Sequence, residues 1–169
     1  MTIAARHPFS PKSEPPSDGR QSPAASDIQR GTIRALRASG LTSVTELPLA
    51  SGRRADIVGV SEKGQIWIVE IKSCLNDFRT DQKWQSYWDY CDRLWFAVGR
   101  DFPVDVLPQE AGLIIADRFG GEIVRESPTE TLTGARRKAM MLRFARTAAE
   151  RLSVLADPDL VARADAARS

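Results

Sequence analysis

Two acidic residues and a lysine are close together in an apolar stretch of the sequence. Glu70 and Lys72 are two positions apart within the run Ile66–Ser73, and Asp56 precedes that run across a Glu-Lys-Gly turn. Side chains two positions apart on a strand point to the same face, so Glu70 and Lys72 should project together. Placing two ions among apolar neighbours costs several kcal/mol per ion unless they are paired or bind something.

These residue types suit one kind of chemistry. Carboxylates of Asp56 and Glu70 on adjacent strands would form an oxygen-lined site for Mg²⁺, with Mn²⁺ as a substitute. Mg²⁺ completes its coordination with waters and phosphate oxygens. Lys72 beside it would orient or deprotonate an attacking water and neutralise charge in the transition state. The pattern predicts metal-assisted phosphodiester hydrolysis; the alternative interpretation is a structural ion pair.

The spacing alone is weak support, because Asp81 and Lys83 repeat it. That copy falls in a predicted helix, where a step of two residues turns the side chains about 200° apart. No further acid supports it. We therefore expect Asp81 to lie outside the site.

Several other kinds of chemistry are disfavoured. The single histidine, His7, falls in an expected disordered tail, which removes His-based nucleophilic catalysis and His-ligated metals. The two cysteines, Cys74 and Cys91, form no metal or disulfide pattern. Neither a GxxxxGK[ST] loop nor a GxGxxG turn is present, so we expect no nucleotide cofactor.

The chain divides into a tail, one domain and a second tail. Residues 1–25 hold five of the ten prolines and almost no large apolar side chain, which predicts a disordered Pro/Ser-rich tail. Residues 26–153 are enough for one domain, and residues 154–169 are expected to be flexible. Apolar runs are too short for a membrane span, and no secretory signal is evident. We expect a soluble, cytoplasmic protein that does not bind membranes.

The elements expected from periodicity form an α/β arrangement. Trp84, Tyr87, Trp88 and Cys91 recur at helical spacing and predict a helix whose aromatic side chains lie in the core. The expected order is a helix at 26–39, strands at 42–50, 54–60 and 65–72, a helix at 80–91, a strand at 94–98, a further strand pair at 112–116 and 122–125, and a C-terminal helix.

The C-terminal helix is basic. Residues 134–152 carry six cations and one acid, against a net charge of +2 for the whole chain. A helical wheel places five arginines on one arc (Arg136, Arg137, Arg143, Arg146, Arg151) and four apolar residues opposite (Met141, Ala145, Ala148, Leu152). The arginine arc would contact nucleic-acid phosphates, or would be an ordinary solvated face; both interpretations stay open.

Five more residues are candidate site residues near Asp56, Glu70 and Lys72, which are called here the acid–lysine group. Arg53 and Arg54 would hold a phosphate or lower the proton affinity of the neighbouring Asp56. Arg79 and Lys83 would face the same opening or be ordinary exposed charges. Glu46, on the preceding strand, would supply an extra metal ligand or face solvent.

Four segments carry a resemblance to a known family. Ser51–Asp56, Ile66–Ser73, Asp89–Arg93 and Ala135–Ala139 resemble the MmcB family of bacterial DNA-repair proteins across roughly residues 27–152. The element order is also similar to the PD-(D/E)XK core of restriction-endonuclease-like nucleases. Ala55 replaces the proline of that motif, and the first helix lacks the Glu that many relatives carry.

The resemblance implies an α/β fold with a restriction-endonuclease-like core, in which helices flank a central mixed sheet of four to five strands and a basic helix follows. It implies a role in DNA repair, including tolerance of crosslinking damage, in the bacterial cytoplasm near the nucleoid. Mg²⁺ would be bound by Asp56, Glu70 and the backbone carbonyl of Ile71, with Lys72 as the catalytic lysine.

Two functions follow as hypotheses. The first is a Mg²⁺-dependent DNA nuclease acting at damage or repair intermediates. The second is a catalytically silent module on the same fold that binds DNA or recruits other repair proteins. The oligomeric state stays open; a homodimer would suit the nuclease hypothesis, because many cleavage tasks on duplexes need two sites.

Overall fold

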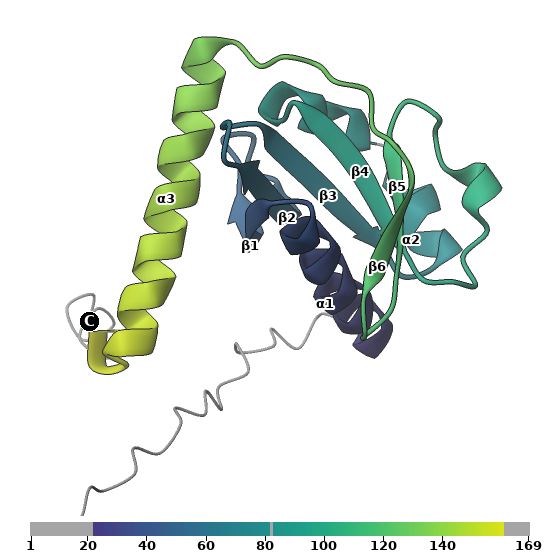
Figure 1. The fold of residues 1–169 in the computed structure, drawn as a ribbon, viewed down its shortest axis with the longest axis horizontal. Helices are drawn as coiled ribbons and strands as arrows, with labels where there is room; N and C mark the ends of the chain where they lie inside the picture. Colours follow the sequence, from purple (N-terminus) through teal and green to yellow (C-terminus); the bar gives the residue numbers. More distant parts are fainter. Residues whose placement is uncertain (1–21, 82, 161–169) are drawn as a thin grey trace, which may run out of the picture.

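The computed structural model describes residues 22–81 and 83–160, which form one six-stranded sheet with helices on both faces (Figure 1). The strands follow the sheet in sequence order: β1 (Leu41–Pro48), β2 (Arg54–Ser61), β3 (Ile66–Lys72), β4 (Arg93–Val98), β5 (Gly112–Ala116) and β6 (Gly121–Arg125). The expected α/β class with a mixed sheet flanked by helices is confirmed. The expected count of four to five strands was too low, because β5 and β6 continue the same sheet.

The pairing changes from antiparallel to parallel and back across the sheet. The β1–β2 and β2–β3 pairs are antiparallel, β3–β4 and β4–β5 are parallel, and β5–β6 is antiparallel. All seven residues of β3 are buried, as expected for a strand covered on both faces. Glu70 and Lys72 are therefore buried within the sheet, whereas Asp56, on β2, is half-buried.

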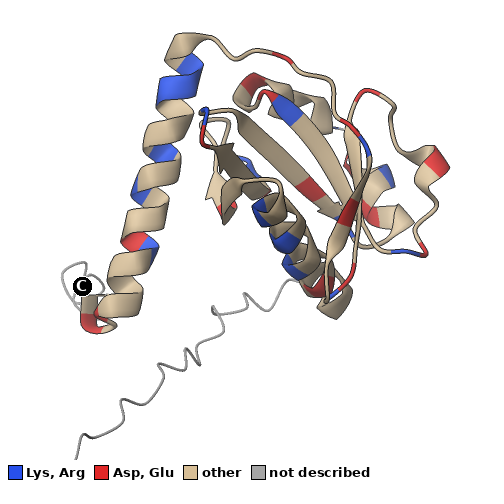
Figure 2. Cartoon of the chain, viewed as in Figure 1, with Lys and Arg blue, Asp and Glu red and all other residues tan. Residues whose placement is uncertain are grey.

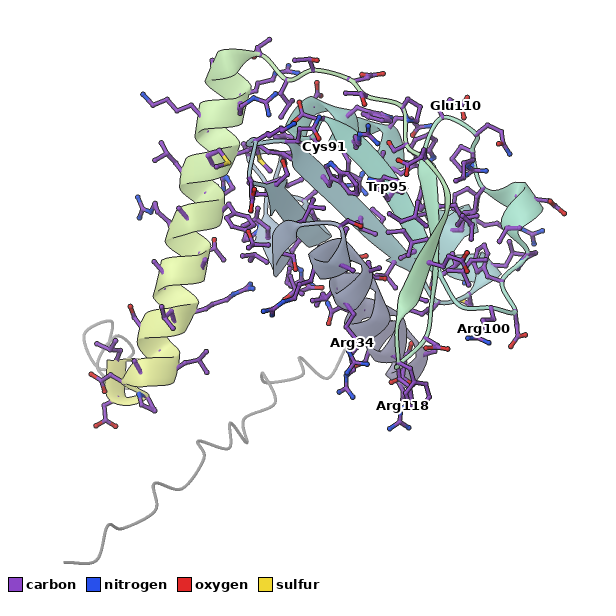
Figure 3. The ribbon with its side chains drawn as sticks, in the orientation of Figure 1. Arg34, Cys91, Trp95, Arg100, Glu110 and Arg118 are labelled. Atoms are coloured by element: carbon purple, nitrogen blue, oxygen red, sulfur yellow. The ribbon has the colours of Figure 1, made fainter. Side chains whose placement is uncertain are left out.

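One face is covered by α1 (Pro23–Ala38), which packs on Trp67 and Trp95 among others. Ser22 caps α1 by accepting a hydrogen bond from the Ala25 amide, so the helix begins three residues before the predicted start. α1 also contacts the β5–β6 turn, where the Arg34 guanidinium donates to the carbonyls of Arg118 and Phe119 (Figure 3).

The second face carries α2 (Leu75–Thr80), two 3-10 helices, η1 (Trp84–Tyr90) and η2 (Val104–Val106), and α3 (Gly134–Ala156). The single helix expected at 80–91 was wrong, because the chain breaks at Asp81 into α2 and η1. The aromatic side chains nevertheless pack into the core as predicted: Tyr87 is buried, and Trp84 meets the Phe96 ring edge-on at 5.6 Å.

The predicted orientation of the C-terminal helix was wrong in part. Met140 is buried, and Phe144 and Ala148 pack beside it, whereas Met141 and Leu152 of the predicted apolar arc are exposed. The reason is that arginines on the packing side find acceptors in the protein, so a mixed face is buried instead of a purely apolar one. The helix also runs to Ala156, three residues into the expected C-terminal tail.

Residues 1–21 and 161–169 of the two expected tails lie outside the described residues. Across residues 22–81 and 83–160, no helix has both the length and the apolar character needed to cross a membrane.

Candidate functional site

The pairing of β2 with β3 ends where the two carboxylates stand. The register pairs Ile57 with Val69, so Asp56 and Glu70 are the next residues to face each other. Their carboxylates take over the backbone bonds there: the Ile71 amide donates to Asp56 Oδ2 at 2.7 Å, and the Asp56 amide donates to Glu70 Oε1 at 3.4 Å. Each acid is thus held by the other's strand.

Glu46 lies in the same cross-strand row. The β1–β2 register pairs Thr45 with Ile57 and Leu47 with Ala55, which leaves Glu46 opposite Asp56. The backbone of Glu46 has a left-handed φ of 51°, and its carboxylate is ion-paired with the Arg54 guanidinium. Among the described residues, no group of three or more His, Cys, Asp or Glu side chains could hold a metal ion.

Burial dominates the electrostatics of the two central acids. Glu70 is 4% exposed and Lys72 6% exposed. Burial raises the pKa of Asp56 to about 6, with a contribution from the charge of Glu46, against the opposing Ile71 amide and Lys72. Burial and the neighbouring Asp56 raise the pKa of Glu70 as well. A positive charge bound between two adjacent carboxyl groups with raised pKa values would favour their ionised forms.

The donor set fits a divalent cation with few protein ligands. Oδ1 of Asp56 and Oε2 of Glu70 accept no hydrogen bond from the described residues, and both are hard oxygen donors. A cation between them would offset the cost of ionising two carboxylates whose pKa values are raised mainly by burial. Mg²⁺ is bound in this way by one or two carboxylates, with waters and phosphate oxygens completing its octahedron.

Lys72 is held by Asp81, the acid that sequence reasoning left outside the site. Lys72 Nζ lies 2.8 Å from Asp81 Oδ2, and Arg53 Nη2 lies 3.0 Å from Asp81 Oδ1. Burial acts to raise the pKa of Asp81, but the hydrogen bonds from Lys72 and Arg53 outweigh it and leave the pKa lowered. One feature of the sequence could have indicated this position: Asp81 is a polar residue between two aromatic segments. At this point the chain returns over the end of β3.

The predicted cationic residues around this group have separate positions. Arg53 also donates to the Lys83 carbonyl at 2.7 Å and stacks over the Tyr87 ring at 4.7 Å, so it is part of the wall of the site. Arg54 pairs with Glu46, as described above. Arg79, at the end of α2, and Lys83, just before η1, are exposed.

Four of the five arginines of α3 bond to acceptors of the protein itself. Arg137 makes two 2.7 Å hydrogen bonds to the carboxylate of Asp92, which is 2% exposed and also accepts from the Ile66 and Leu132 amides. Arg136 pairs with Asp89 at 2.7 Å on the surface. Arg143 donates to the Pro48 carbonyl at 3.2 Å. The structure thus brings these residues to acceptors of their own chain.

Fold and site together define an α/β protein with a mixed six-stranded sheet and a buried acid–lysine group where two strands separate. The chain belongs to the MmcB-like family of DNA repair proteins, whose model matches residues 12–159. Membership indicates a role in DNA repair, and with it contact with DNA.

One solved structure is similar over most of both chains. It is the SPO1766 protein of unknown function from Silicibacter pomeroyi, with 46% sequence identity and a TM-score of 0.79, covering 83% of this chain and 95% of that one. A comparison with curated proteins finds no match.

Proposed function

We propose that the protein is a metal-dependent nuclease that hydrolyses phosphodiester bonds of DNA at damage sites or repair intermediates. The observation that carries the proposal is that the half-buried Asp56 and the buried Glu70 are each held by the other's strand, with Lys72 two positions along β3 from Glu70. The fold would then be a restriction-endonuclease-like version of the α/β class, as the sequence motif implies.

The residues would divide the work as follows. Asp56 and Glu70, with the Ile71 carbonyl, would hold Mg²⁺ or Mn²⁺, which supplies Lewis acidity and an activated water when bound. Lys72 would lie beside the scissile phosphate and would stabilise the negative charge that develops in the transition state. Asp81 fixes the direction of the lysine side chain.

A second candidate is a catalytically silent module that binds DNA or recruits repair proteins. It is favoured by the closed ion pair between Lys72 and Asp81, because an ammonium whose charge is already matched has less field to offer a phosphate. In that case the acid–lysine group would be a structural network within the sheet.

Cleavage assays separate these candidates. Labelled single-stranded, duplex, flap and fork DNAs are incubated with Mg²⁺ or Mn²⁺ and wild type, Glu70→Gln or Lys72→Met, and binding is followed on the same samples. The matched control is Glu62→Gln, an exposed acid in the β2–β3 turn. The nuclease proposal predicts cleavage that falls about 100-fold or more in the two site variants and not in the control.

The same samples identify the silent module. It predicts that no DNA is cut with either metal, that wild type binds DNA, and that Glu70→Gln binds equally well. That result would refute the nuclease proposal.

A further inference from the structure

The solvent side of α1 consists of arginines. From Ile28 to Arg37 the exposed residues are Arg30, Arg34 and Arg37, and every other residue is buried or half-buried. At 100° per residue, steps of four and three place these arginines in one row, about 10 Å long. Figure 2 shows blue segments along the length of α1. The helix therefore presents a row of cations to solvent.

The row of arginines is not balanced by acids of the same segment. After Asp27, at the start of α1, the next Asp or Glu in the sequence is Glu46. Like charges three or four residues apart destabilise a helix, and an ordinary solvated face mixes the two signs. An unbalanced row is therefore better explained by an anionic partner outside the chain.

The β5–β6 turn extends the row. Arg34 Nη1 donates to the carbonyls of Arg118 at 2.8 Å and Phe119 at 2.9 Å, which leaves Nη2 and Nε without a hydrogen bond to the described residues. Helix and turn touch at Gly31, where a Cβ would lie 2.0 Å from the Asp117 carbonyl oxygen, so only glycine fits. Figure 3 shows Arg34 and Arg118 at the same end of the molecule. The helix and the turn thus form one continuous surface.

This turn also carries an exposed aromatic ring. Phe119 is 75% exposed, the highest value among the large hydrophobic side chains of the described residues, and the Arg118 guanidinium lies over its ring at 5.1 Å. The neighbouring carboxylate of Asp117 is already paired with Arg100 at 3.0 Å. An exposed ring beside an arginine is a platform on which an unpaired base can stack.

We propose that Arg30, Arg34, Arg37, Arg118 and Phe119, called here the α1 surface, bind a single strand of DNA. The arginines contact phosphates, which guanidinium groups bind bidentately. Phe119 stacks on an unpaired base, because bases stacked within a duplex offer no free face. DNA is the polyanion that fits membership of a DNA-repair family. The proposal goes beyond the proposed function, since α1 covers the face of the sheet opposite α2 and η1 and binding there needs no hydrolysis.

The basic helix α3 is a poorer candidate for the same strand. Its Arg137, Arg143 and Arg151 donate hydrogen bonds to acceptors of the chain itself. Arg37 and Arg118 make no hydrogen bond or ion pair with the described residues. Guanidinium groups that are already bonded within the chain have fewer donors left for a phosphate.

Fluorescence anisotropy of the full chain with a labelled single-stranded oligonucleotide tests the proposal, in EDTA and over a range of salt concentrations. Arg37→Gln and Arg118→Gln should each weaken binding about fivefold and lower the slope of log affinity against log salt by about 0.7. The matched control is Lys138→Gln, an exposed cation of α3, which should bind like wild type. Arg34 is kept in every variant because it holds the turn.

Phe119 distinguishes a single strand from a duplex. Phe119→Ala should weaken binding of the single strand about tenfold without changing the salt slope, because it removes stacking and no charge. Binding of a duplex of the same sequence should be unchanged, and Phe119→Trp should bind the single strand at least as tightly as wild type. Thermal unfolding of each variant confirms that it is folded.

Any of three results would overturn the proposal: arginine variants that bind like wild type, an equal loss of affinity in Lys138→Gln, or a Phe119→Ala variant that keeps its affinity for the single strand. EDTA removes the metal, so cleavage does not enter the assay. The α1 surface and the proposed function therefore fail separately. Metal-dependent cleavage that Glu70→Gln abolishes, with DNA binding unaffected by the α1 variants, would retain the nuclease and refute the α1 surface.

Discussion

Replacing Arg137 with Met should destabilise the protein far more than the same change at Arg136, although the two residues are neighbours in a basic helix. Arg137 forms two hydrogen bonds to the buried Asp92 carboxylate, whereas Arg136 pairs with Asp89 at a site where both side chains are more than half exposed. The sequence alone treats them as equivalent phosphate contacts.

The magnitude follows from what Asp92 retains. Breaking a buried ion pair costs about 3–5 kcal/mol when the remaining charge is uncompensated. Asp92 keeps the Ile66 and Leu132 amides, and the Arg137 side chain is 29% exposed, so we expect about 2–3 kcal/mol. That corresponds to roughly 6–10 °C in Tm for a domain of this size. Arg136→Met should cost about 0.5 kcal/mol or less.

The effect has a pH signature. Burial acts to raise the pKa of Asp92, but the bonds from Arg137 and the two amides leave it lowered, so this stability is present at neutral pH and lost as pH falls through the folded-state pKa. The difference between wild type and Arg137→Met should therefore be largest near pH 7 and shrink in acid. Urea unfolding at several pH values measures it. Equal stability of the two arginine variants at pH 7 would refute the structural role of Arg137.

Three further outcomes are expected. Asp56→Asn should be about 2 kcal/mol more stable than wild type in urea unfolding at pH 8, and no more stable at pH 3. The reason is that the pKa of Asp56 is raised to about 6, so the ionised carboxylate destabilises the fold. Mg²⁺ should raise the Tm of wild type and not that of the variant. Gly112→Ala should cost about 1–3 kcal/mol in the same assay, because a Cβ there overlaps the Trp95 indole. Asp81→Asn should lower single-turnover cleavage at least tenfold with unchanged DNA affinity, because Lys72 loses its anchor; full activity would exclude a positioning role.

The pleat of a strand made the centre of the site predictable. Glu70 and Lys72 lie on one face because the period of a strand is two, and their apolar neighbours marked β3 as central. Asp56 followed from the turn that joins β2 to β3. These inferences are local, since each depends on a few consecutive residues and the geometry of one hairpin.

Contacts across the fold were not predictable in this way. Asp81 reaches Lys72 only because the chain leaves α2 and crosses back over β3, and helical spacing concealed that break. Arg137 reaches Asp92 over 45 positions of sequence. A helical wheel sorts side chains by polarity alone, so it placed the arginines in solvent. It contains no information about the carboxylate and carbonyl acceptors that other parts of the fold bring to them.

The arginines of α3 that donate hydrogen bonds to β1 have one more consequence. β1 is an edge strand, and Arg143 and Arg151 occupy the carbonyls of Pro48, Thr45 and Glu46. A bare edge is a template for strand addition and aggregation. A chain that ended before Arg143 would keep every strand and the acid–lysine group yet lose this cover. Such truncated molecules should pair edge to edge, so resistance to fibril formation depends on a helix that contributes no strand to the sheet.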